Sequence, residues 1–293
     1  MKILVTGSKG QLGKQIINIL KNKRSEIGAI STEYDNLEII QVDVEELDIT
    51  DFISVKEYFG KVMPDVVINC AAYTNVDACE SKEDLAFKIN ALGPRNLAIA
   101  SNKFGAKLVH VSTDYVFNGE GTSPFKEYDM PNPVSVYGKT KLAGENFVRE
   151  FADKYFIVRT AWLYGYEGNN FVYTIMKVGK EKGKLTVVND QRGNPTNAED
   201  LAHHLLKIAV TEEYGTYHCT GTGECSWYDF ASKIIEFSEI ECVVQPVTSE
   251  EYVRAAKRPS FSSLDNMMLR VTVGDEMRKW EDALKVFISK INK

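Results

Sequence analysis

The chain has 293 residues, of which 44% are hydrophobic and 26% are charged. This composition is close to the globular average and argues against intrinsic disorder, collagen and coiled coil. The length suits about two domains of ordinary size. The 41 acidic residues outnumber the 35 basic ones, for a formal net charge of −6. A general binder of nucleic acid or of an anionic membrane would need a net basic face, so we expect neither partner.

The five cysteines are scattered, and no two of them have CxxC spacing. Neither a disulfide framework nor a zinc site is indicated, and reduced thiols in a cytoplasmic protein are the simplest interpretation. No run approaches the roughly 18 apolar residues of a membrane-spanning helix, and the N-terminal apolar run reaches glycine too early for a signal peptide. We therefore expect a soluble, cytoplasmic protein.

Up to about residue 163, short apolar runs alternate with amphipathic stretches. The runs predict strands at residues 3–5, 27–30, 38–42, 65–69, 107–111 and 155–160. The stretches predict helices at about 12–20, 49–62, 82–104 and 137–153, the third interrupted near Gly93-Pro94. Strands that are apolar on both faces and separated by helices predict an α/β fold with a doubly wound, Rossmann-type parallel sheet.

After about residue 163 the pattern loosens. It predicts helices near 170–182, 197–210, 227–238 and 275–291, and short strands near 185–188, 216–219 and 242–246. We expect a dinucleotide-binding domain over residues 1–163 and a smaller C-terminal α/β substrate-binding domain over residues 164–293. The boundary is soft, because later segments can return to the sheet.

A glycine loop follows the first predicted strand and opens the first helix, with Gly7, Gly10 and Gly13 in GxxGxxG spacing. Gly7 allows a tight turn, Gly10 lets the backbone approach a pyrophosphate, and Gly13 permits close packing of helix and sheet. The helix N-terminus adds N–H donors and the positive end of the helix dipole. This arrangement predicts a dinucleotide site.

The choice between NADH and NADPH stays open. An acidic residue at the end of the second strand would bind the adenosine ribose and favour NAD. With that strand at residues 27–30, Glu33 and Asp35 lie a little beyond its end, and Lys9 and Arg24 are the nearest basic candidates for a 2′-phosphate.

The segment Tyr137-Gly138-Lys139-Thr140-Lys141 contains a YxxxK pattern at the start of a predicted helix. Residues four apart share one helix face, so the Tyr137 hydroxyl and the Lys141 ammonium can point into one site. A nearby cation stabilises a phenolate, which suits a tyrosine that moves protons. Thr113 ends an upstream strand, at the edge of a parallel sheet where ligands bind.

Together, these motifs resemble the extended short-chain dehydrogenase/reductases, and in more detail the family of dTDP-4-dehydrorhamnose reductases. The segments that carry the closer resemblance are NCAAYTNVDACE, STDYVFNGEG, NPVSVYGKTKLAGE, VRTAWLYG and NDQRGNPT. They occur in the family's order and cover nearly the whole chain.

The resemblance, together with the glycine spacing, implies a cofactor site for NADPH or NADH. Its residues would be Gly7, Gly10, Gln11, Leu12, Gly13, Asp48, Ile49, Ala71, Ala72, Tyr73, Thr74, Val111, Tyr137 and Lys141. The sugar would be contacted by Thr113, Asp114 and Trp162. The candidates for the diphosphate or nucleotide are Asn169, Asn170, Arg192, Lys257 and above all Arg258.

The implied reaction is hydride transfer to C4 of dTDP-4-dehydro-L-rhamnose, which gives dTDP-L-rhamnose. Tyr137 would protonate the developing alkoxide, Thr113 would position that oxygen, and Lys141 would lower the pKa of the tyrosine and bind the nicotinamide ribose. A nucleotide-sugar epimerase or dehydratase of the same superfamily is one alternative, although Tyr115 stands where a dehydratase would carry a glutamate. A non-catalytic regulatory subunit, similar to the β subunit of methionine adenosyltransferase, is another.

Some members of this family carry magnesium between the subunits of a dimer, held by glutamates. Here Gln15 occupies the first-helix position that could contribute one, although Glu199 stands in NPTNAEDLA. Magnesium is therefore disfavoured, and both a homodimer and a monomer stay open.

Overall fold

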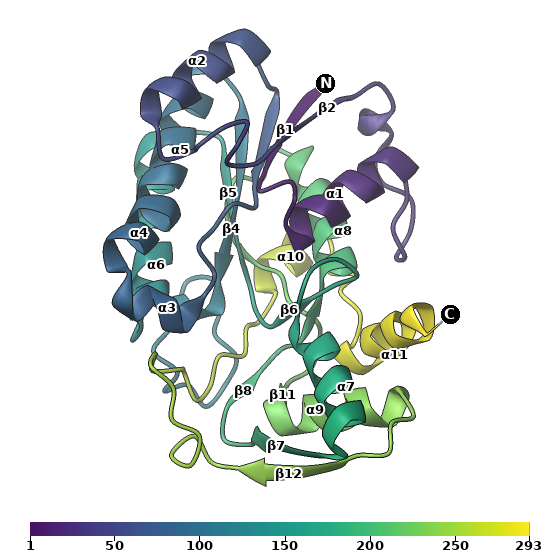
Figure 1. Cartoon of the computed structure of the whole chain (residues 1–293). Helices are drawn as coiled ribbons and strands as arrows, with labels where there is room; N and C mark the ends of the chain where they lie inside the picture. The colour runs from purple at the N-terminus through teal and green to yellow at the C-terminus, as the bar shows by residue number, and fades with distance from the viewer. Residues whose placement is uncertain (293) are drawn as a thin grey trace.

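The computed structural model describes residues 1–292 and has a six-stranded parallel sheet at its centre (Figure 1). The strand order is β10-β5-β4-β3-β1-β2. The strands are β1 (Lys2–Thr6), β2 (Glu38–Val42), β3 (Val66–Asn69), β4 (Lys107–Thr113), β5 (Tyr155–Thr160) and β10 (Gly215–His218). The chain leaves β1 toward β2 and then returns to the other side of β1 at β3. Ligands of open parallel sheets bind at the carboxyl ends of strands flanking such a reversal.

Helices cover both faces of the sheet, which confirms the predicted doubly wound α/β fold (Figure 1). One face carries α1 (Gln11–Asn22), α8 (Ala198–Ala209) and α10 (Met267–Val271). The other carries α2 (Phe52–Val62), α5 (Gly93–Phe104) and α6 (Val136–Phe151). Between β3 and α5 lie α3 (Val76–Ser81), α4 (Glu83–Phe87) and a π-helical turn, η2 (Lys88–Leu92). The interruption predicted near Gly93-Pro94 is this π-helical turn.

The second half of the chain builds a smaller lobe around its own apolar core. Its helices are α7 (Phe171–Lys182), α9 (Trp227–Phe237) and α11 (Trp280–Ile291). Its strand pairs are β7 (Lys184–Val188) with β12 (Val243–Val247), β6 (Leu163–Tyr164) with β9 (Thr196–Asn197), and β8 (Arg192–Gly193) with β11 (Cys225–Ser226). β10 and α8 leave this half of the chain and join the central sheet and its helical layer.

Some of the predicted elements are wrong or displaced. Residues 27–30 form no strand; they belong to a turn in which Ser25 N–H donates to the carbonyl of Gly28, at 2.8 Å. The helix expected from residue 49 begins at Phe52 because the Asp51 carboxylate caps it, and the last helix begins at Trp280 rather than near 275. Among residues 1–292, no helix combines the length and the apolar character needed to cross a membrane.

Candidate functional site

A cavity of about 600 Å³ lies at the carboxyl ends of β1, β3 and β4, between the sheet and the smaller lobe. The predicted site residues that line it are Gly7, Gly10, Gln11, Leu12, Gly13, Ala72, Thr74, Val111, Thr113, Asp114, Tyr137, Lys141, Trp162 and Arg258. Asn169 lines it as well. Segments from both halves of the sequence therefore meet at one site.

The glycine loop is packed too tightly for side chains. Gly7 has a φ of +62°, and a Cβ there would lie 2.7 Å from the Ala71 nitrogen. A Cβ at Gly13 would lie 2.8 Å from the Ser8 Cα. Gly10 precedes α1 without a capping side chain, so the first N–H groups of this helix remain available to an anion.

Tyr137 stands at the start of α6, where the Ser135 hydroxyl caps the helix by accepting from Gly138 N–H at 3.2 Å. Its ring meets that of Tyr115 edge to face, with centroids 5.5 Å apart. Burial raises the pKa of Tyr137 above its ordinary value, and hydrogen bonding with Thr113 offsets part of the shift. The phenol is therefore neutral at physiological pH, which is the form that can donate a proton.

Lys141 is buried one helical turn beyond Tyr137. Its ammonium donates to the carbonyl of Val111 at 2.7 Å, a bond to the strand and not to the phenol. Burial lowers the pKa of Lys141 to about 8, against the opposing influence of Glu145. The predicted effect of Lys141 on the tyrosine pKa stays a prediction.

Thr113 and Asp114 are both buried where β4 ends. The Thr113 hydroxyl donates to the Asp114 carboxylate at 2.9 Å. Burial raises the pKa of Asp114 to about 6, and hydrogen bonding with Ser262 and with Thr113 offsets part of this shift. Both residues line the cavity.

Two stacked indoles form part of the cavity wall. The Trp162 and Trp227 rings lie 3.6 Å apart between centroids, at an interplanar angle of 8°. Trp162 has a left-handed φ of +46°, and its indole fits against Gly193, where a Cβ would lie 2.6 Å from it. Sequence reasoning missed Trp227, because no spacing rule links the end of β5 with the start of α9.

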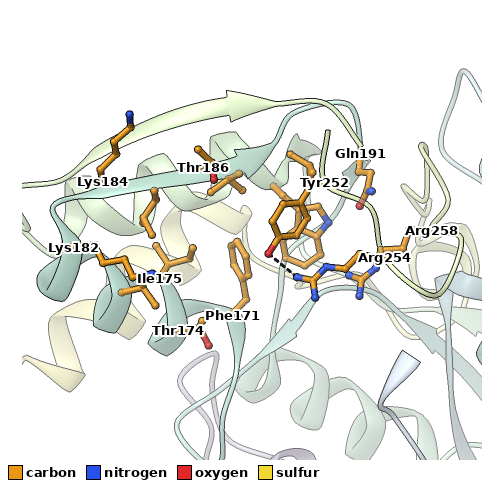
Figure 2. A pocket seen from close by; sticks show the side chains of 15 residues that line it. Phe171, Thr174, Ile175, Lys182, Lys184, Thr186, Gln191, Tyr252, Arg254 and Arg258 are labelled. Carbon is orange, nitrogen blue, oxygen red and sulfur yellow. Dashed lines mark hydrogen bonds between the residues drawn. The ribbon is translucent and has the colours of Figure 1, made fainter. Parts of the chain in front are cut away.

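A second cavity of about 410 Å³ adjoins the first and shares Trp227 and Arg258 with it (Figure 2). Its apolar lining is Phe171, Ile175, Val178, Leu185, Val187 and Val188. Tyr252 and Arg254 also line it; the Arg254 guanidinium lies over the tyrosine ring, 4.6 Å from its centroid, and donates to its hydroxyl at 3.0 Å. No motif or spacing in the sequence points to Tyr252 or Arg254.

Four predicted cofactor residues do not line the described cavity. Ile49 is buried in the core beside Gly93, and the exposed Asp48 accepts from Thr50 N–H. The Tyr73 N–H donates to the Asn90 side-chain oxygen, and the Asn90 amide donates to the Tyr73 carbonyl. The Ala71 N–H donates to the Asn69 side-chain oxygen. Among the diphosphate candidates, Arg192 pairs with Glu224 at 3.0 Å, Lys257 is exposed, and Asn170 caps α7.

The acidic residue expected to influence the choice between NADH and NADPH lies elsewhere than the sequence pattern predicted. The strand beside β1 is β2, so the acidic residue at its end is Asp43 rather than Glu33 or Asp35. The Asp43 carboxylate accepts from Lys9 N–H at 3.0 Å, directly beside the glycine loop. The Lys9 ammonium is itself paired with Glu45 and Glu46, at 2.8 and 3.2 Å.

Because three carboxylates surround Lys9, we expect Asp43→Asn to favour NADPH. Removing one negative charge near a 2′-phosphate should raise the ratio of kcat/KM for NADPH to that for NADH by about three- to tenfold. Steady-state kinetics with both cofactors measure this ratio. Glu33→Gln is the matched control and should leave the ratio unchanged; an equal change in both variants would contradict the assignment of Asp43.

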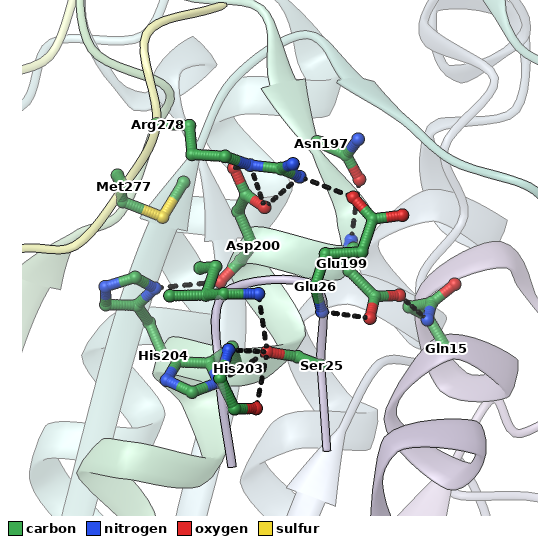
Figure 3. Close-up of polar contacts among 12 residues, drawn as sticks. Gln15, Ser25, Glu26, Asn197, Glu199, Asp200, His203, His204, Met277 and Arg278 are labelled. Carbon is green, nitrogen blue, oxygen red and sulfur yellow. Dashed lines mark hydrogen bonds and ion pairs between the residues drawn. The ribbon is translucent and has the colours of Figure 1, made fainter. Parts of the chain in front are cut away.

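The carboxylates that could hold magnesium are engaged by the chain's own donors (Figure 3). Glu26 accepts from Arg278 at 2.8 Å and from Lys290 at 2.6 Å, and Asp200 is also paired with Arg278. Glu199 accepts from Glu26 N–H at 3.0 Å and from the Gln15 amide. Magnesium needs near-octahedral oxygen ligands, and these oxygens already face cations and N–H donors. The residues therefore do not fit the metal.

Chelation should accordingly leave the protein unchanged. We expect the same Tm in thermal unfolding with EDTA, with MgCl₂ and with NaCl at matched ionic strength. A Tm increase specific to Mg²⁺ would show that a cation displaces Arg278 or Lys290 from this cluster.

Comparison with known proteins places the chain among close relatives. A family model described as RmlD substrate binding domain matches residues 1–293. The spore coat polysaccharide biosynthesis protein SpsK of Bacillus subtilis is 40% identical over 287 residues, which cover 98% of this chain and 96% of that protein.

Two solved structures extend the comparison. One is a dTDP-4-dehydrorhamnose reductase from Clostridium acetobutylicum, with 51% identity, a TM-score of 0.94 and complete coverage of both chains. The other is a dTDP-4-dehydrorhamnose reductase from Bacillus anthracis in complex with NADP, with 44% identity, a TM-score of 0.92 and 99% coverage of both chains.

Proposed function

This chain belongs to the RmlD substrate binding domain family, and we propose on that premise that it reduces the C4 keto group of dTDP-4-dehydro-L-rhamnose with NADPH or NADH. The observation that carries the proposal is the pair of joined cavities. One contains the glycine loop with Thr113, Tyr137 and Lys141, and the other is an apolar pocket reached past Arg258. A nucleotide sugar has the matching order of parts: a keto sugar, a diphosphate and a flat base.

We propose the following placement of the substrate. The sugar lies in the first cavity, with its apolar face against Trp162 and its hydroxyls toward Asp114. The diphosphate lies at Arg258, at the junction of the cavities. The base enters the second cavity, where Phe171 and Tyr252 offer aromatic surfaces. The lobe after residue 163 thus supplies most of the nucleotide contacts, which is the sense in which we propose it as the substrate domain.

A bound nicotinamide supplies the hydride. The neutral Tyr137 phenol donates its proton to the C4 oxygen as negative charge develops there. The Thr113 hydroxyl turns from Asp114 to donate to the same oxygen and holds it in position. Lys141 would hold the ribose of the bound cofactor, and its ammonium would stabilise the phenolate that remains on Tyr137 after proton transfer. The Asp114 carboxylate, which lines the same cavity, orients the sugar by accepting from a hydroxyl. Cavity walls from both lobes limit the access of water.

The deciding experiment mixes the enzyme with dTDP-4-dehydro-L-rhamnose and either reduced cofactor and follows the loss of nicotinamide absorbance. With a cofactor deuterated at the transferred position, the label should appear at C4 of the product. No oxidation with either cofactor would overturn the proposal. Interconversion of sugars without net oxidation would indicate an epimerase, and a co-purifying partner without turnover would indicate a regulatory subunit.

We also propose a cytoplasmic location and a homodimer. The described cysteines form no disulfide, which suits a reducing compartment. Exposed apolar side chains on α4, Leu85 and Phe87, offer a surface for a second copy. Light scattering during size-exclusion chromatography tests the assembly, since a monomer has a mass of 33.0 kDa.

A further inference from the structure

Residues 250–258 form a strap that crosses from the smaller lobe to the mouth of the cavities. Its first end is fixed by Ser249, whose N–H and hydroxyl donate to Asp190 at 2.8 and 2.7 Å. Its second end is fixed beyond residue 258, where Ser260 and Phe261 donate to the carbonyl of Gly119 at 2.8 and 3.1 Å. The strap is therefore anchored at both ends, and what holds its middle decides where its side chains lie.

The middle of the strap is held by one carboxylate. Asp77, in the first turn of α3, accepts from Ala256 N–H at 3.2 Å and from Arg258 at 3.4 Å, and lies 3.7 Å from the Arg254 guanidinium. Within residues 1–292, every hydrogen bond and ion pair from the strap to the sheet-bearing lobe ends on Asp77. Asp77 thus accepts a hydrogen bond from the backbone of the strap and is the shared counter-ion of two arginines.

These two arginines face the ligand cavities. Arg258 lines both cavities and Arg254 lines the second. The Arg258 Nε is buried and has no hydrogen-bond partner among the described residues. A guanidinium has five N–H donors in a planar fork, which matches phosphate oxygens better than the single, long contact that Asp77 provides. The pairing with Asp77 is geometrically poor and open to replacement.

We propose that Asp77 is a placeholder counter-ion for the substrate diphosphate, a positioning residue that sets affinity without touching the reacting atoms. When the diphosphate arrives, it takes over Arg254 and Arg258, while Asp77 keeps the Ala256 N–H and so holds the strap in place. This assignment rests on the proposed function, because it takes a nucleoside diphosphate as the ligand. Asp77 would therefore compete with the diphosphate for the two arginines and would also hold the strap through the hydrogen bond from Ala256 N–H.

Two substitutions separate these roles. Asp77→Asn removes the charge but keeps an oxygen that can accept from Ala256 N–H, so it should tighten the binding of thymidine diphosphate by about three- to tenfold. Asp77→Ala removes the charge and the clamp, so it should bind more weakly than the asparagine variant by about fivefold. Asp84→Asn on α4 removes a neighbouring charge that has no contact with the strap, and it is the matched control.

Titration calorimetry with thymidine diphosphate measures these affinities without turnover. Hydrogen exchange supplies a second readout, because the Ala256 amide should stay protected in the asparagine variant and lose protection in the alanine variant. In steady-state kinetics, Asp77→Asn should lower the KM for the keto sugar and leave kcat unchanged. An asparagine variant that binds no more tightly than the wild type, or an alanine variant that binds as tightly as the asparagine variant, would overturn the proposal.

The outcome is separable from the proposed function. If the wild type binds thymidine diphosphate and the variants follow the expected order, Asp77 has this role even if no keto sugar is reduced. If the keto sugar is reduced but the affinities do not follow that order, the proposed reductase activity is supported and the proposed role of Asp77 is wrong.

Discussion

Tyr137→Phe is expected to lower kcat for keto-sugar reduction by about 10²- to 10⁴-fold, the usual contribution of a positioned proton donor. The ring remains and keeps its packing against Tyr115, so the cavity should retain its shape. Only the proton for the C4 oxygen is lost. Absorbance at the nicotinamide band gives the rate, and fluorescence titration with the cofactor should give a Kd close to that of the wild type.

Tyr115→Phe is the matched control for this result. It removes a second phenol from the same cavity, and the loss of one neutral hydrogen bond should cost about tenfold at most. Undiminished reduction by the Tyr137 variant, or an equal loss in both variants, would contradict the assignment of Tyr137 as the proton donor.

The largest expected loss of stability follows from Arg159→Met. Arg159 and Glu145 are 1% and 0% exposed, respectively. The guanidinium donates to both oxygens of the Glu145 carboxylate at 2.9 and 2.8 Å. Removing Arg159 leaves the buried Glu145 carboxylate with only the partly exposed Arg149 as a counter-ion, at 2.7 Å. Breaking a buried pair in this way should lower the free energy of unfolding at pH 7 by about 3 kcal/mol. Urea denaturation measures this difference.

The same change should alter the pH dependence of stability. Burial acts to raise the pKa of Glu145, but Arg159, Arg149 and the Ser112 hydroxyl outweigh it and lower the pKa to about 2. In the wild type, the stabilising contribution is therefore present above the ordinary glutamate pKa and is lost as the pH falls toward 2. In Arg159→Met, burial should dominate and raise this pKa, so the deficit relative to the wild type should shrink as the pH falls.

Glu145→Gln in the Arg159→Met background is the control for this pair. Because both charges are then absent, the double variant should recover part of the lost stability. If the free energy of unfolding of Arg159→Met lies within about 1 kcal/mol of the wild-type value, the buried pair is not a main source of stability.

The parts of the site that the sequence predicted are those whose geometry is local. The GxxGxxG turn and the Tyr137/Lys141 pair depend on residues a few positions apart, so their spacing alone places them on a turn or on one helix face. The sheet was predictable for a related reason, since its strands are apolar on both faces. The confirmed family agrees with these motifs.

The remaining parts depend on packing between distant segments. The apolar run at 27–30 has strand composition but lies in a turn, so the strand next to β1 is β2 and the acidic residue at its end is Asp43. Trp227, Tyr252 and Arg254 meet the site only because the smaller lobe folds back onto the sheet. The two-residue strands of that lobe are too short to show any periodicity.

The position of β10 in the central sheet has consequences for folding during synthesis and for truncation of the chain. This strand is contributed by residues 215–218, yet it pairs with β5 at the edge of the central sheet. During synthesis, one edge of β5 therefore stays unpaired until the ribosome has released nearly three-quarters of the polypeptide. Such long-range strand pairing slows folding and exposes intermediates to aggregation. A fragment truncated after residue 163 would keep the glycine loop and Tyr137 but expose that edge. The central sheet is thus completed only by residues from the second half of the chain, although the glycine loop and Tyr137 lie in the first half.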